Sequence, residues 1–206
     1  MKSTQRPRPE PRDPVAAYLR RLGLTLAIAI AMWLVLRPVL DSAVAGGAEV
    51  LLRAFEVPRV TRLLPVDHRA EVRRADFRSD SALPTVPLTE IHFNAVVLLA
   101  LFLALPRPWS RRQLERLFMG ATVLYATQVL NLWLHVKWIY ATGLGEWSLA
   151  HTSDLWRNLI GFLRYFFDLP GRFSFPVVIW LALNWDEVMK LVSGRAPPVP
   201  RKRGRR

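Results

Sequence analysis

The chain has 206 residues, of which 51% are hydrophobic, a formal net charge of +13 and no cysteine. Its length suits one domain or one small helical bundle. The absence of cysteine excludes disulfides, thiolate metal sites and a cysteine nucleophile. The basic residues flank apolar blocks, which is how membrane proteins fix their orientation, so the charge does not indicate a nucleic-acid partner.

Residues 1–21 are rich in Pro and Arg and are predicted to form a disordered basic tail. The apolar residues 22–40 follow, and at about 1.5 Å per residue they cover about 28 Å, close to the hydrocarbon thickness of a bilayer. They are predicted to form the first membrane span. A cleaved secretory signal is the alternative, because Ala43-Val44-Ala45 offers a small-residue cleavage site. The length of the apolar stretch favours an uncleaved span.

Residues 41–90 form a segment too rich in charge to span a bilayer unassisted. Its first part, residues 41–56, has a partial apolar face that predicts a short helix. Short alternating stretches on either side of Pro65-Val66-Asp67 predict a small β-hairpin.

Three further spans are predicted, together with one helix that lies in the membrane interface. The interfacial helix is expected over residues 155–168, where apolar residues recur at helical spacing between charged ones. A turn is expected at Asp168-Leu169-Pro170-Gly171. The three spans are expected at residues 91–105, 117–136 and 173–190. A second basic tail is expected at residues 193–206.

The fold class is therefore an all-α integral membrane protein, residues 22–192, with about four transmembrane helices and a small extracytoplasmic helix and β-hairpin. Lysine and arginine number six in residues 1–21, four in residues 107–116 and seven in residues 186–206. The short loop is the most densely basic, and short loops decide topology, so both termini are predicted to lie in the cytoplasm of a bacterial inner membrane.

One polar constellation is the candidate site. Gln128, Asn131 and His135 are spaced three and four apart and share one face of the third span. Polar side chains in a span face the bundle interior, because lipid cannot satisfy them. They are predicted to meet polar residues from the outer end of the second span and the second outer loop: Glu90, His92, Asn94 and His151.

Interhelical hydrogen bonding is the leading interpretation of this cluster, and a binding or catalytic pocket is the alternative. A metal site built from His92, His135 and His151 is disfavoured, because no HxxxH or HExxH spacing occurs. No Gly-rich phosphate loop occurs either, so no metal and no cofactor is expected.

The segment FNAVVLLALFLALPRPWSRRQLERLFMGATVLYATQVLNLW, residues 93–133, resembles the core of the exosortase/archaeosortase superfamily of membrane cysteine transpeptidases. The resemblance implies a Cys where this chain has a residue such as Asn94. It also implies an Arg shortly after Asn131, where this chain has Leu134 and His135, and a later His comparable to His151. With the Cys and the Arg missing, the chain is not expected to be an active sortase.

The chain is more similar to the small exosortase H-associated membrane proteins. The likeness rests on Trp33, on the Phe93-Asn94 pair and on the last span, PVVIWLALNWDEV. It implies a non-catalytic inner-membrane accessory protein, whose partners are the lipid bilayer and an exosortase-like transpeptidase. A membrane enzyme that uses the outer His, Glu and Asn residues, and a small transporter or channel subunit, remain as alternatives.

Overall fold

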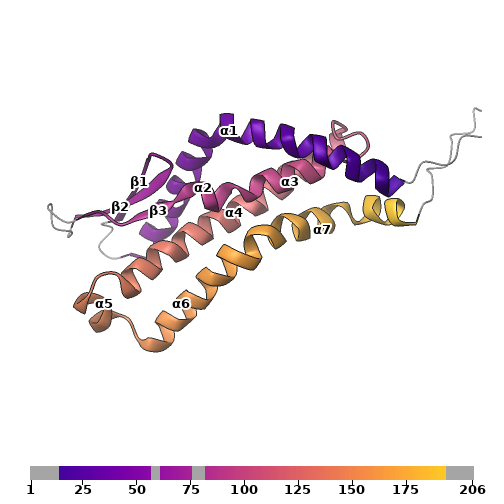
Figure 1. The fold of residues 1–206 in the computed structure, drawn as a ribbon. Helices are drawn as coiled ribbons and strands as arrows, with labels where there is room; N and C mark the ends of the chain where they lie inside the picture. The colour runs from indigo at the N-terminus through magenta and orange to yellow at the C-terminus, as the bar shows by residue number, and fades with distance from the viewer. Residues whose placement is uncertain (1–13, 57–60, 76–81, 194–206) are drawn as a thin grey trace, which may run out of the picture.

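The computed structural model describes residues 14–56, 61–75 and 82–193, which form a mostly helical bundle with one small sheet (Figure 1). The sheet and the short helix α5 (Glu146–His151) lie at one end of the elongated bundle, here called the sheet end. The start of the first helix, the connection after α3 and the end of the last helix lie at the opposite end, called the tail end.

Helix α1 (Pro14–Ala54) is one continuous element. It begins inside the predicted tail, because Tyr18 donates a hydrogen bond to the Leu101 carbonyl and stacks on the Trp180 ring. Residues 1–13 and 194–206, which hold the rest of the predicted tails, lie outside the described residues. The helix also continues through Pro38, so the separate short helix expected over residues 41–56 is its second half.

Small residues let the second half of α1 pack closely on α4 (Arg111–Thr142). A Cβ atom on Gly47 would lie 2.4 Å from the Tyr125 hydroxyl oxygen, so no larger residue fits there without movement. The Tyr125 hydroxyl donates a hydrogen bond of 2.9 Å to the Ala43 carbonyl. This contact holds α1 against α4 on the C-terminal side of the point where Pro38 removes a backbone donor.

The predicted hairpin is confirmed, and its strands are β1 (Thr61–Val66) and β2 (Arg69–Arg74). A third strand, β3 (Thr85–Pro87), pairs antiparallel with β2 and was not predicted. Both central residues of the hairpin turn, Asp67 and His68, have positive φ angles, 47° and 62°. Two-residue hairpin turns of type I′ require this backbone conformation.

One face of the sheet packs on α1 and α4 through buried apolar residues, among them Leu63, Val72 and Leu52. The outer edge of β1 is closed by α1, because the Leu63 amide donates to Glu49 and the Thr61 amide donates to Glu56. Pro65 has no amide hydrogen to expose at this edge. The edge of β1 therefore offers no row of free donors for another strand.

Two short helices follow the sheet, α2 (Leu88–His92) and α3 (Asn94–Leu103). Helix α3 packs against α1, α4 and α7 (Arg172–Val192), so this apolar segment lies inside the bundle. Residues 88–103 are shorter than the other apolar helices.

The last part of the chain differs from the prediction. Helix α6 (Asp154–Phe166) passes through a single π-helical turn, η1 (Phe167–Gly171), directly into α7. The predicted interfacial helix is thus joined to the last helix, and the turn expected at residues 168–171 is helical. Pro170 has no amide hydrogen to donate, and a π turn is one way in which a helix accommodates such an interruption.

Three helices of the described part are long and apolar enough to cross a membrane: Val15–Ala54, Arg111–Thr142 and Asp154–Val192. The three agree with the predicted membrane class, and the small sheet agrees with the predicted hairpin segment. The predicted second span corresponds to the shorter apolar stretch Leu88–Leu103.

Candidate functional site

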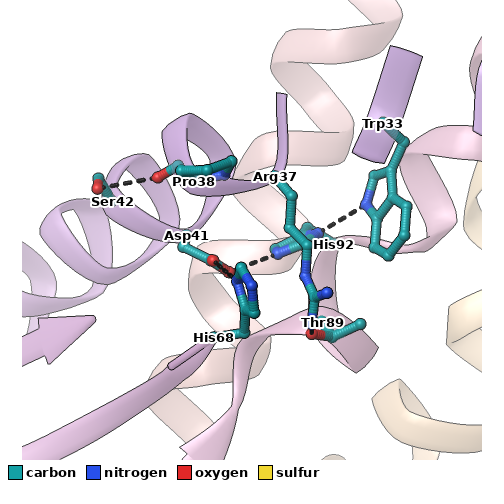
Figure 2. A network of polar contacts seen from close by, with 8 residues as sticks. All are labelled: Trp33, Arg37, Pro38, Asp41, Ser42, His68, Thr89 and His92. Carbon is teal, nitrogen blue, oxygen red and sulfur yellow. Dashed lines mark hydrogen bonds and ion pairs between the residues drawn. The ribbon is translucent and has the colours of Figure 1, made fainter. Parts of the chain in front are cut away.

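A chain of four polar side chains joins α1, α2 and the hairpin turn (Figure 2). The indole nitrogen of Trp33 lies 2.9 Å from Nδ1 of His92, and Nε2 of His92 lies 2.8 Å from Oδ1 of Asp41. The second oxygen of Asp41 lies 2.6 Å from Nδ1 of His68. His92 is fully buried and Asp41 is nearly so, whereas 42% of the His68 side chain is exposed.

The direction of each hydrogen bond in this series of four side chains follows from the indole of Trp33 at one end, which can only donate. An indole N–H can only donate, so Nδ1 of His92 accepts and carries no hydrogen. Nε2 of His92 then carries the hydrogen of the neutral ring and donates it to Asp41. The other carboxylate oxygen accepts from Nδ1 of His68. Nε2 of His68 has no partner among the described residues.

Arg37 braces the same region from the preceding turn of α1. Its guanidinium lies 5.5 Å from the centre of the Trp33 ring, and Nη2 donates to the Thr89 hydroxyl at the start of α2. Arginine over an indole ring is favourable through the ring quadrupole. The hairpin turn, α1 and α2 are therefore tied together by one connected set of polar contacts.

The polar residues of the predicted second and third spans were expected to meet, and they do so at one place, between Asn94 on α3 and Gln128 on α4. The Gln128 amide nitrogen lies 2.7 Å from Oδ1 of Asn94, and both side chains are buried. Each amide satisfies the other where lipid or an apolar core offers no partner. This pair fixes the two helices against each other.

Asn131 and His135 instead face the π-helical turn η1. Nε2 of His135 lies 3.2 Å from Oδ2 of Asp168, and the Asn131 amide nitrogen lies 3.4 Å from Oδ1. Nδ1 of His135 lies 3.0 Å from the Asn131 carbonyl oxygen, so both ring nitrogens face acceptors. Arg164 adds a weak contact of 3.5 Å to the same carboxylate. The group is a compact set of polar contacts between α4 and the α6–η1 helix.

The two remaining predicted residues lie apart from these groups. Glu90 forms an ion pair of 2.9 Å with Arg172 at the start of α7. His151 stacks on Trp147 within α5, with ring centroids 4.5 Å apart. The seven predicted residues therefore do not form one cluster. The structure brings together two pairs of them: Asn94 with Gln128, and Asn131 with His135.

Sequence reasoning missed the partners Trp33, Asp41, His68 and Asp168. Asp41 is the first carboxylate after the first apolar segment, and His68 directly follows the predicted turn at Pro65-Val66-Asp67, so the sequence around each residue gave some indication of a role. Their pairing did not, because Asp41 and His92 are 51 residues apart in sequence.

A cavity of about 260 Å³ opens beside this polar chain, between α1 and the hairpin turn. Six residues line it: Pro38, Asp41, Ser42, Pro65, Asp67 and His68. Within the described residues, no group of three or more His, Cys, Asp or Glu side chains is arranged to hold a metal ion. Comparison with protein-family models, curated proteins and solved structures finds no match to this chain.

Proposed function

We propose that this chain is a non-catalytic, four-span inner-membrane protein that accompanies an exosortase-type sorting transpeptidase. The observation that carries the non-catalytic part is that three of the candidate site residues, His92, Asn94 and His135, are engaged by partners within the chain. His92 and His135 each use both ring nitrogens, and Asn94 is held by Gln128.

Nucleophilic catalysis needs an activated nucleophile within hydrogen-bond reach of a base. In the described part of the chain, the bases with an unengaged ring nitrogen are His68 and His151. Ser42, which lines the cavity with His68, donates its hydroxyl to the Pro38 carbonyl at 3.0 Å. The chain has no cysteine. These features favour a scaffold role over the membrane-enzyme alternative.

The fourth span of this proposal is the shorter segment Leu88–Leu103. It is supported by its packing between α1, α4 and α7, since a helix surrounded by spans need not be long enough to span alone. The orientation is supported by the tail end of the bundle, where the start of α1, the end of α7 and the connection between α3 and α4 lie together (Figure 1). This connection, residues 104–110, includes the basic residue Arg107. Lysine and arginine next to spans favour the cytoplasm.

Reporter fusions test the topology. Fusions after Arg112 and at the C-terminus are expected to report cytoplasm, and fusions at Arg73 and Ser148 are expected to report the outer side. A cytoplasmic signal at Arg73 would contradict the four-span arrangement.

The proposed partner is supported by the resemblance of this sequence to exosortase-associated proteins. Co-purification tests whether the two proteins interact. The tagged chain is expressed with an exosortase-like transpeptidase and isolated in mild detergent after chemical cross-linking. The enzyme is expected to co-purify, and processing of its substrate is expected to require the enzyme. Absence of the enzyme from the complex, or processing by the purified chain alone, would overturn the proposal.

A further inference from the structure

The cavity between α1 and the hairpin turn has side chains that offer hydrogen-bond acceptors and no unengaged donor. The only side-chain hydroxyl in its lining, that of Ser42, donates to the Pro38 carbonyl. Nδ1 of His68 donates to Asp41. Pro38 and Pro65 contribute rings without an amide hydrogen.

Two groups in the lining form no hydrogen bond within the described residues. Asp41 is not one of them, because its two oxygens accept from His92 and His68. The carboxylate of Asp67 forms no hydrogen bond or ion pair within the described residues. In the neutral ring of His68, Nε2 carries a lone pair, because the hydrogen bond to Asp41 places the ring hydrogen on Nδ1. The cavity thus combines one unpaired carboxylate, one imidazole lone pair and two apolar proline rings.

The hairpin turn places these two acceptors next to each other, and it does so with an uncommon backbone conformation at both residues. Asp67 and His68 both have positive φ angles, a conformation that glycine adopts without strain and that other residues adopt less readily. Neither position is a glycine, and both side chains line the cavity. The hydrogen bond from His68 to the buried Asp41 fixes the orientation of the imidazole ring.

We propose that this cavity binds a primary ammonium group on a short alkyl chain. An ammonium group carries three donors and no acceptor, which complements a lining whose side chains offer only acceptors. Its positive charge pairs with Asp67, one N–H points to Nε2 of His68, and the alkyl carbon packs on the proline rings. An anion or a carboxylate would meet the Asp67 charge and find no free side-chain donor in the lining.

Two sources supply this chemistry, the ethanolamine headgroup of a phospholipid and a free alkylamine. The headgroup is within reach because Asp41 directly follows residues 22–40, the first predicted span, so the cavity lies at the level where lipid headgroups begin. The inference needs the cavity alone and does not depend on a sorting enzyme as partner.

The charged and titratable groups around His68 define which variants are informative. Asp41 contacts it from α1, and Asp67 precedes it in the turn. His92 of α2 contacts the other oxygen of Asp41, and Arg37 and His68 are both charged or titratable neighbours of His92. Asp41 and His92 belong to the buried chain, so changing them disturbs the fold. Asp67→Asn removes the carboxylate and keeps a residue that favours positive φ, so the turn conformation is retained.

The test uses the full chain in dodecyl maltoside micelles, with histidines labelled at carbon for NMR. The chain has four histidines, and His68→Gln assigns the His68 signal. Ethylammonium chloride is titrated at millimolar concentrations against tetramethylammonium chloride, which has the same charge and no N–H donor. In a second arm, the chain in phosphatidylethanolamine nanodiscs is compared with the chain in phosphatidylcholine nanodiscs.

Ethylammonium is expected to shift the His68 signal in a saturable way, and tetramethylammonium is not. Asp67→Asn should weaken ethylammonium binding by about tenfold, as expected for one charge-assisted hydrogen bond. Asp154→Asn, a change at an exposed carboxylate on α6, should leave binding unaltered. A shift in phosphatidylethanolamine as well assigns the site to the lipid headgroup, and a shift with ethylammonium alone assigns it to a free amine. Equal responses to the two ammonium ions, or unchanged binding in Asp67→Asn, would overturn the proposal.

Discussion

Removal of the Asp41 carboxylate should destabilise the protein more than any exposed acidic substitution. In Asp41→Ala, Nε2–H of the fully buried His92 loses its acceptor, and an unsatisfied buried donor costs about 1–3 kcal/mol. The bond to the half-exposed His68 contributes less, up to about 1 kcal/mol. The expected loss is therefore about 1–4 kcal/mol, which lowers Tm by about 2–16 °C for a chain of this size.

Asp41→Asn is the matched variant. Its amide oxygen can still accept from Nε2–H of His92, and its amide nitrogen can donate to Nδ1 of His68 if the exposed ring changes tautomer. Its loss of stability should be well below that of Asp41→Ala. Thermal unfolding of the purified protein in detergent measures both variants, with Asp154→Ala as the exposed control. If Asp41→Ala unfolds at the same temperature as Asp154→Ala, the buried chain in Figure 2 does not stabilise the fold.

Two further substitutions test the packing at the sheet end. Gly47→Ala should lower Tm because its Cβ would lie 2.4 Å from the Tyr125 hydroxyl, whereas Gly46→Ala, with nothing within 4 Å, should be neutral or stabilising in a helix. Equal effects in thermal unfolding would count against the close approach of α1 and α4. His135→Leu should cost about 1–3 kcal/mol, because the Asp168 carboxylate in η1 loses its nearest side-chain hydrogen-bond donor at a largely buried position. The exposed His151→Leu should stay within about 0.5 kcal/mol in the same assay, and a similar loss in both variants would refute this interpretation.

Hydropathy and local turn chemistry were sufficient to predict the long helices and the hairpin. The apolar stretches have the length of a bilayer, and the hairpin strands alternate on either side of a turn. The helix boundaries were less predictable, because proline was read as a helix end. Pro38 and Pro170 both lie within continuous helices. In each case long-range contacts hold the helix together, and a single sequence does not reveal such contacts.

The candidate site shows the same limit more clearly. The face formed by Gln128, Asn131 and His135 followed from helical spacing, and all three side chains do point toward other elements. Which elements they meet did not follow. Asp168 is the partner of two of them, and it was predicted to be in a turn rather than in a π-helical turn that faces α4.

Several polar side chains near the sheet end join two elements, and this separates them from the residues available for binding. Asp41, His92, Gln128 and His135 each link helices or link a helix to the hairpin turn. Substitutions there alter folding, so a lost activity would not identify a binding role. The carboxylate of Asp67 and Nε2 of His68 are left unused by the described part of the fold although both border the cavity. Binding should therefore be tested by substitution of Asp67, whose side chain makes no contact among the described residues that holds the bundle together.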